Sequence, residues 1–210
     1  MKRSFTLIEL LVVIAIFGLT ASLITASYLT FERNQRLKNA ALMIKSDVRL
    51  VADKAFSGDK IINDAGTDTL CLKQDKLIGW YLSFSTRTID DSNTKYRMSG
   101  RCRDSAVSEV DFGDKIINLP SDVIISDLVY TGGGPDVETY DILFSPLLHN
   151  VYVNDGDFTP DFVENEDSEG NLNLVDTFYT NGDLVIELTL QSSKYKVTIN
   201  SLGEVREEKI

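Results

Sequence analysis

The fold of this chain is decided by residues 5–31, which read FTLIELLVVIAIFGLTASLITASYLTF and carry one charged side chain, Glu9. About 20 apolar residues are enough for a helix to cross a bilayer, and this run is longer. Lys2 and Arg3 precede the run, and charged residues resume at Glu32. Because basic flanks stay on the cytoplasmic side, the sequence predicts a single-pass protein of the cytoplasmic membrane with a cytoplasmic N-terminus and an exported body.

Glu9 is out of place in such a run. A carboxylate at the centre of a membrane helix costs about 2.5–3.5 kcal/mol, and somewhat less near the interface. Since residues 5–31 contain no basic side chain, its partner must be another chain or a new terminus. Two alternatives leave Glu9 unexplained: a plain signal anchor, or a secretory signal peptide cut near Thr20–Ser22 or Thr25–Ser27.

Residues 4–16, SFTLIELLVVIAI, resemble the class III signal of type IV pilins and type II secretion pseudopilins. In that family a prepilin peptidase cuts before the phenylalanine and methylates the new amino group. The glutamate at the fifth mature position then pairs with the N-terminus of a neighbouring subunit. The resemblance implies cleavage between Ser4 and Phe5, N-methylation of Phe5 and an assembly role for Glu9. Ser4 departs from the family's glycine, which implies slower processing.

An amphipathic helix is predicted to continue beyond the apolar run. Residues 32–57 contain no Pro or Gly, and apolar residues recur at alternating four- and three-residue steps. If both halves are continuous, residues 5–57 form one helix about 80 Å long. Gly58 stands at a usual helix-ending position. The apolar stripe consists of Leu37, Ala41, Ile44, Val48, Val51 and Ala55.

Beyond residue 66 the apolar residues alternate with polar ones, which indicates strands. The expected strands are 78–86, 95–100, 122–131, 140–145, 174–180 and 183–190, with a further one around Tyr195–Ile199. Asn181-Gly182 predicts a tight hairpin between residues 174–180 and 183–190. The last thirty-five residues read as an antiparallel meander with one buried face.

The expected fold class is therefore α+β, with a long N-terminal helix packed on an antiparallel β-sheet domain. The expected parts are a leader peptide at 1–4, a transmembrane assembly helix at 5–31, its amphipathic second half at 32–57 and an extracytoplasmic β-rich domain at 58–210.

Charge separates these parts. The formal net charge is −11, yet residues 1–57 hold eight Lys/Arg against four Asp/Glu, and the other 153 residues hold thirteen against twenty-eight. A body this acidic repels phosphate backbones, so nucleic acid is not expected as the main partner.

Short segments of the body are similar, in order, to the H-type minor pseudopilins and their T-type pilus relatives: residues 34–55, 79–84 (GWYLSF), 142–146 (ILFSP) and 197–205 (VTINSLGEV). That resemblance implies a helix packed on two small sheets and a minor, priming subunit near a filament tip. The implied partners are other pilin or pseudopilin subunits, prepilin peptidase and an inner-membrane assembly platform. One branch of these relatives binds DNA through Gly-Arg-x-Arg. Here Gly203 is followed by Glu204, which argues against a DNA-uptake pilin.

Two cysteines, Cys71 and Cys102, are disulfide candidates, because the exported body would fold where disulfides form. A bridge closing this loop would contribute about 3–4 kcal/mol. Two unpaired thiols remain the alternative, and two distant cysteines are too few to bind a metal.

Residues 165–176 resemble a degenerate calcium loop, with oxygen-bearing side chains at the ligand positions and Gly170 at the sixth position. Flanking helices are not evident, so a solvated acidic loop is the favoured interpretation and no cofactor other than this weak calcium possibility is expected. The candidate ligands are Asn165, Asp167, Glu169, Asn173 and Asp176.

Catalysis is not expected. His149 is the only histidine, and no nucleophile elbow, phosphate loop or clustered metal motif accompanies it. The remaining alternatives are a signal-anchored extracytoplasmic binding module and a secreted acidic enzyme.

Overall fold

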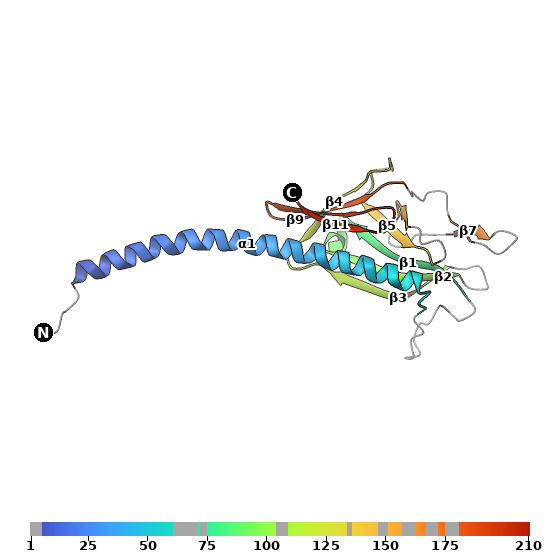
Figure 1. Ribbon diagram of the computed structural model, residues 1–210, viewed down its shortest axis with the longest axis horizontal. Coiled ribbons are helices and arrows are strands. Elements are labelled where there is room, and N and C mark those ends of the chain that lie inside the picture. The colour runs from blue at the N-terminus through green and yellow to red at the C-terminus, as the bar shows by residue number, and fades with distance from the viewer. Residues whose placement is uncertain are drawn as a thin grey trace. The chain divides into compact units, whose positions relative to one another are not determined.

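The computed structural model describes residues 6–60, 71, 75–103, 109–133, 136–146, 151–156, 163–166, 172–174 and 181–210. For residues 22–27, 91, 163–166 and 172–174 it describes the backbone and not the side chains. The chain divides into two compact units, 1–36 and 37–210. One long helix and a set of antiparallel strands make up the described secondary structure (Figure 1). The α+β class expected from the sequence is confirmed.

Helix α1 spans Leu7–Phe56 and ends where the sequence predicts. Gly58 has a φ of 67°, a left-handed conformation that glycine adopts without strain. The Gly58 amide donates to the Ala55 carbonyl at 3.0 Å, and the Asp59 amide donates to the Lys54 carbonyl at 2.9 Å. These two bonds form a Schellman motif, which satisfies carbonyl groups that the helix end would leave unpaired.

The first unit, residues 1–36, contains the N-terminal part of α1. Within the part of the chain that the structure describes, no helix has a stretch both long and apolar enough to cross a membrane. The membrane crossing expected for residues 5–31 is therefore not confirmed.

The second unit contains two main sheets. The larger has the order β3-β2-β1-β5-β6 and the smaller the order β11-β10-β9-β4, while β7 pairs with β8. The larger sheet comprises β1 (Lys76–Ser85), β2 (Lys95–Arg103), β3 (Glu109–Asn118), β5 (Thr139–Phe144) and β6 (Val151–Asn154). The smaller comprises β4 (Ile124–Tyr130), β9 (Leu184–Leu190), β10 (Ser193–Ile199) and β11 (Val205–Lys209). The remaining elements are the 3₁₀ helix η1 (Ile89–Thr94), β7 (Val163–Glu166) and β8 (Leu172–Leu174).

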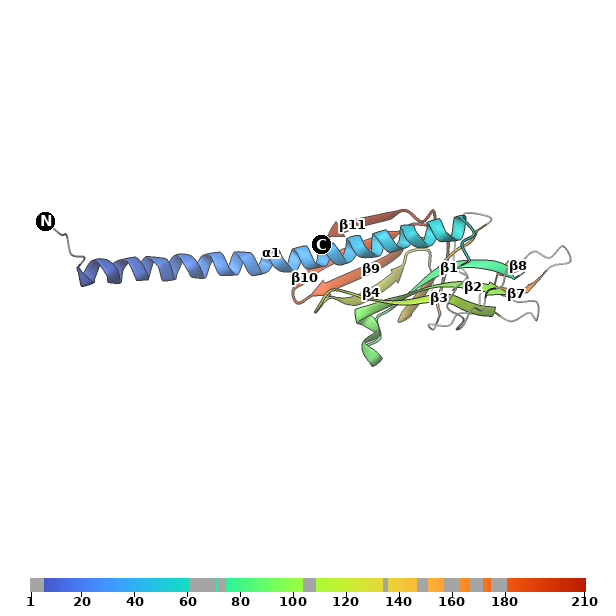
Figure 2. The same cartoon turned by 90° about the horizontal axis from the view of Figure 1, so that it is seen from below.

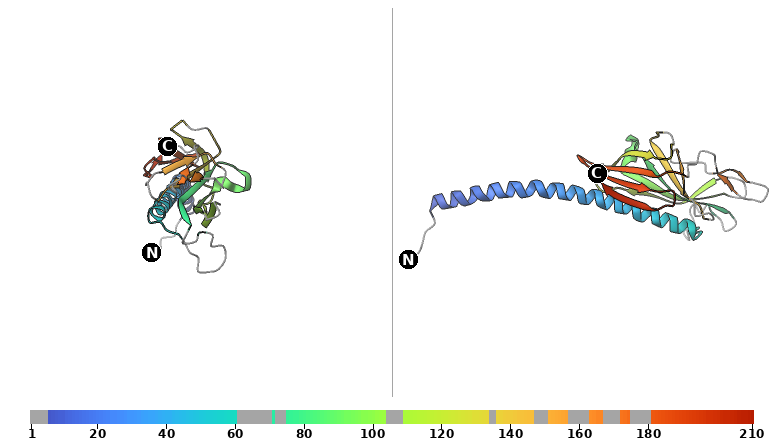
Figure 3. Two further views of the ribbon diagram at one scale, coloured as in Figure 1. Left: turned by 90° about the vertical axis from the view of Figure 1, so that its right-hand side faces the viewer. Right: turned by 45° about the horizontal axis from the view of Figure 1, so that its top comes forward.

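The core of this unit forms where the second half of α1 meets both sheets. All six apolar residues of the predicted stripe are fully buried, together with Ala40. They belong to one apolar cluster with Trp80 and Phe84 of β1, and with Ile186 of β9 and Val197 of β10. Figure 2 and the right panel of Figure 3 show this part of the helix running along the strands. Burying a large apolar side chain contributes about 1.5–3 kcal/mol, so the stripe fixes the helix to the body.

The predicted C-terminal meander is confirmed, since β9 pairs with β10 and β10 pairs with β11. Of the first strand of the hairpin predicted at Asn181-Gly182, Leu174 lies in β8 and residues 175–180 lie outside the described residues. The described neighbours of β9 are β10 and β4. Gly182 lies against Gly132, and the Thr131 amide donates to the Asp183 carbonyl at 3.0 Å.

Candidate functional site

The first turn of α1 is closed by a reciprocal pair of hydrogen bonds. The Thr6 amide and the Thr6 hydroxyl donate to Glu9 Oε2 at 3.0 and 2.9 Å. The Glu9 amide in turn donates to Thr6 Oγ1 at 3.4 Å. This is a capping box, in which a threonine and a glutamate three residues later satisfy helix-end amides. The Glu9 carboxylate therefore has a partner within its own chain, which the sequence analysis did not expect.

The capping box was readable in the sequence. Thr6-Leu7-Ile8-Glu9 has the pattern of Ser or Thr followed three residues later by Glu, directly before an apolar run. The apolar residues around Glu9 suggest a carboxylate within a membrane, whereas the threonine three residues earlier indicates a local hydrogen bond. Ser4 and Phe5, the expected cleavage residues, lie outside the described residues, so the described chain begins one residue beyond the expected new terminus.

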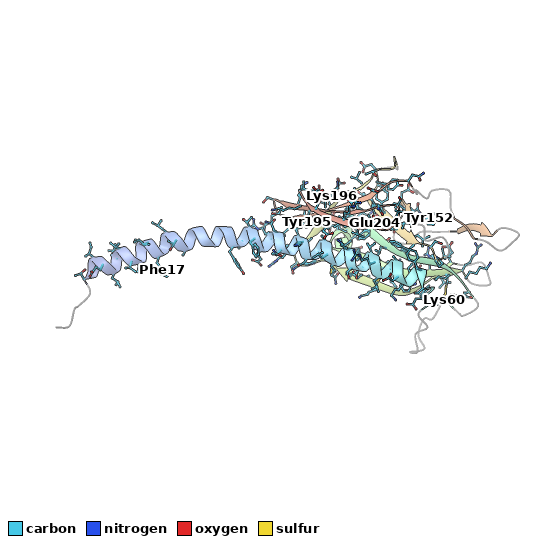
Figure 4. The ribbon with its side chains drawn as sticks, viewed as in Figure 1. Phe17, Lys60, Tyr152, Tyr195, Lys196 and Glu204 are labelled. Atoms are coloured by element: carbon cyan, nitrogen blue, oxygen red, sulfur yellow. A yellow bond between two sulfur atoms is a disulfide. The ribbon has the colours of Figure 1, made fainter. Side chains whose placement is uncertain are left out.

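The apolar side chains that the structure describes in the first unit, between Leu7 and Ala21 and between Tyr28 and Phe31, are all exposed. Their exposed fractions run from 44% at Leu29 to 81% at Leu7. Figure 4 shows Phe17 extending from the helix surface. A helix that is apolar all round is normally buried in protein or lipid, and an exposed apolar surface of this size marks an interaction site. The exposed residues are Leu7, Ile8, Leu10, Leu11, Val12, Val13, Ile14, Ile16, Phe17, Leu19, Tyr28, Leu29 and Phe31.

Apolar exposure continues on the second half of α1. A groove of about 600 Å³ lies on its outer face. Leu42 and Leu50 are 40% and 41% exposed, and Ser46 stands between them at helical spacing. Lys45, Arg49 and Asp53 complete the lining, so the groove combines two leucines with polar and charged side chains.

Polar contacts also fix this half of α1 to the body. Tyr96 of β2 donates its hydroxyl to Asp47 Oδ2 at 2.5 Å, and Lys45 Nζ lies 2.5 Å from Glu207 Oε2 of β11. Burial and the neighbouring Asp47 carboxylate raise the pKa of Tyr96, because both disfavour a phenolate. The hydrogen bond from Lys45 lowers the pKa of Glu207 and outweighs the opposing effect of burial.

Polar contacts also fix the C-terminal end of α1 to strand β1. Trp80 donates its indole N–H to the Asp59 carbonyl at 2.8 Å, and Lys54 Nζ lies 4.2 Å from the centre of the Trp80 ring. A cation at this distance over an indole is attracted by the ring. These contacts hold α1 at the middle and at the C-terminal end of its buried stripe.

A charged network on β1–β3 could not be foreseen from the sequence. Arg97 and Arg101 both lie near the ring of Tyr81, at 5.9 and 5.7 Å. Arg101 Nε donates to Asp111 at 2.7 Å, and Arg97 Nη2 donates to the same carboxylate at 3.1 Å. The network is assembled by strand pairing, and no local pattern in the sequence indicates it.

The structure joins Cys71 and Cys102 in a disulfide with a Cα–Cα distance of 5.8 Å, which lies in the usual range. Of the calcium-loop candidates, Asn165 lies in β7 and Asn173 in β8, and the two are paired across these antiparallel strands. Asp167, Glu169 and Asp176 lie outside the described residues.

The N-terminal segment also matches a known protein family. Residues 1–25 match the family described as the prokaryotic N-terminal methylation motif. No curated protein and no solved structure matches the chain. The matched segment includes the capping box and the start of the exposed apolar helix surface. The chain therefore carries a prepilin-type N-terminal methylation segment, the signature of type IV pilins and pseudopilins.

Proposed function

We propose that this chain is a structural subunit of a type IV pilus or a type II secretion-like filament, and that it acts by assembly. The observation that carries the proposal is the apolar surface around the first unit of α1, which needs protein or lipid to cover it. A prepilin-type segment at the same end supplies the route to such an assembly.

In this proposal residues 5–31 hold the precursor in the cytoplasmic membrane, with residues 1–4 cytoplasmic and the body exported. Prepilin peptidase cleaves between Ser4 and Phe5 and methylates Phe5. An inner-membrane assembly platform then brings the helix against the helices of other subunits. The second unit has its own partly exposed apolar side chains, Leu42 and Leu50, beside a groove on α1.

The proposed place of the subunit is that of a minor, H-type pseudopilin or a T-type relative. The resemblance of the body segments supports it, and two small sheets packed on one helix agree with what that resemblance implies. A signal-anchored binding module is the alternative, and it would keep its leader.

Mass spectrometry of the mature N-terminus tests the proposal. The chain is expressed in a host that contains prepilin peptidase and, as a control, in one that lacks it. We expect N-methylated Phe5 only in the first host. An N-terminus at Met1 in both hosts, or one near Tyr28, would exclude the pilin-like route.

A further inference from the structure

Three metal-binding side chains meet at one end of the larger sheet. The sulfur atoms of Cys71 and Cys102 and a carboxylate oxygen of Asp75 all lie within 4.8 Å of one another. Asp75 is 5% exposed, Cys71 is 3% exposed and Cys102 is fully buried. The sequence offered only two distant cysteines, and the fold adds the third donor that a metal site needs.

The strand register explains why these residues meet. Strands β1 and β2 are antiparallel, with Leu77 opposite Cys102 and Lys76 opposite Arg103. Asp75 directly precedes β1, so it lies at the end of the ladder where β2 finishes. The backbone of Cys71 is held nearby, 5.8 Å from Cys102 between Cα atoms. The sheet therefore places Asp75 beside Cys102, and the disulfide brings Cys71 to the same end of the ladder.

A divalent cation would compensate the charge of the deprotonated cluster. Both cysteines belong to the apolar core cluster that contains Trp80 and Phe112. Two bare thiolates and a carboxylate in such surroundings would be strongly unfavourable, so the reduced sulfur atoms keep their protons until a metal binds and displaces them. A divalent ion would supply two positive charges. The ammonium group of Lys60, which is labelled in Figure 4, donates a hydrogen bond to the Asp75 carbonyl. It places a further positive charge beside the cluster.

We propose that the dithiol form of this cluster binds a zinc-type divalent cation through Cys71, Cys102 and Asp75. Two thiolates and a carboxylate are donors that Zn²⁺ accepts, and water completes its four-coordinate shell. Ca²⁺ is a poor occupant because it requires oxygen ligands. Metal and disulfide use the same sulfur atoms, so they are mutually exclusive occupants, and a bound metal protects the thiols from oxidation until it leaves.

Cobalt titration of the full chain in detergent tests this site. The chain is reduced with a phosphine under anaerobic conditions, and thiolate-to-cobalt absorption is followed in the near ultraviolet. We expect saturation at one Co²⁺ per chain and loss of the band when Zn²⁺ is added. The oxidised chain should show no band, because its sulfur atoms are unable to bind metal.

Variants separate the three ligands. Cys71→Ser should abolish the band. Asp75→Asn should weaken Co²⁺ binding more than the roughly 10- to 100-fold loss typical of an outer-shell change. Asp136→Asn, which changes an exposed carboxylate away from this cluster, is the matched control and should bind as the parent does. Circular dichroism establishes that each reduced variant is folded.

Absence of a thiolate band in the folded, reduced parent chain would overturn the proposal. Unchanged affinity in Asp75→Asn would overturn the three-ligand site. Neither result bears on processing at Phe5, so the filament proposal is tested separately.

Discussion

Glu9 combines two demands on one carboxylate. In the described chain it accepts hydrogen bonds from Thr6 and closes the first helical turn. In the proposed filament it also meets the N-terminus of a neighbouring subunit. The capping role needs an acceptor oxygen, whereas the assembly role needs a negative charge. These requirements are separable, because glutamine also serves in a capping box.

We therefore predict that Glu9→Gln and Glu9→Ala both lose filament incorporation, since both lack the charge. Only Glu9→Ala should also weaken the first turn, because it removes the oxygen that accepts hydrogen bonds from the Thr6 amide and hydroxyl. Incorporation is measured by the amount of chain in sheared filaments relative to the membrane fraction.

Glu32→Ala is the matched control, because Glu32 is a carboxylate of the same helix that pairs with Arg36 at 2.6 Å. It should incorporate normally. Normal incorporation of Glu9→Gln would show that the cap alone is needed and would remove the proposed charge pairing.

At the scale of the elements, local sequence patterns predicted α1 and several strands. The pairing of strands that are distant in the sequence was not predicted. The stripe from Leu37 to Ala55 is a repeat within one helix, and the structure buries all of it. Strand β3 was missed because its alternation is broken at Gly113, which has a φ of 62° beside an irregularity in its pairing with β2. The pairing of β9 with β4, which lies more than fifty residues earlier, has no local signal in the sequence.

The contact between α1 and β11 predicts an acid dependence of stability. The Lys45–Glu207 pair lowers the pKa of Glu207 in the folded chain. A depressed carboxyl pKa stabilises the fold above the unfolded value of about 4.3, and that contribution is lost as the pH falls through the folded pKa. Glu207→Gln should therefore lower the free energy of unfolding at pH 7 by about 0.2–1 kcal/mol, and the difference should vanish in acid.

Thermal unfolding from pH 7 to pH 3 measures this difference. Glu208→Gln is the control, because Glu208 is exposed on the same strand. A gap between parent and Glu207→Gln that persists at the lowest pH would contradict the assigned ion pair.

At the scale of the whole molecule, the disulfide joins residues that are 31 positions apart. Closing a loop of that length restricts the unfolded chain and should stabilise the body by about 3–4 kcal/mol. We predict that Cys102→Ser lowers the free energy of unfolding of the oxidised protein by that amount, measured by denaturant unfolding in metal-free buffer.

The control is the parent chain treated with a reductant and a chelator, which should unfold as Cys102→Ser does. Peptide mapping without reduction should recover Cys71 linked to Cys102. Equal stability of the oxidised parent and the variant would contradict a stabilising bridge.

The two units also differ in what their surfaces require. The exposed apolar side chains of the first unit lie at Leu7–Phe31, whereas the core that fixes α1 to the sheets begins at Leu37. The rest of the chain is strongly acidic, and like-charged molecules stay apart in solution. A chain of residues 32–210 keeps the whole buried stripe and removes the apolar run. It should fold as a monomer without detergent, while the full chain should need detergent or lipid. Sedimentation and thermal unfolding compare the two, and self-association of residues 32–210 would place the main assembly surface on the body instead of the N-terminal helix.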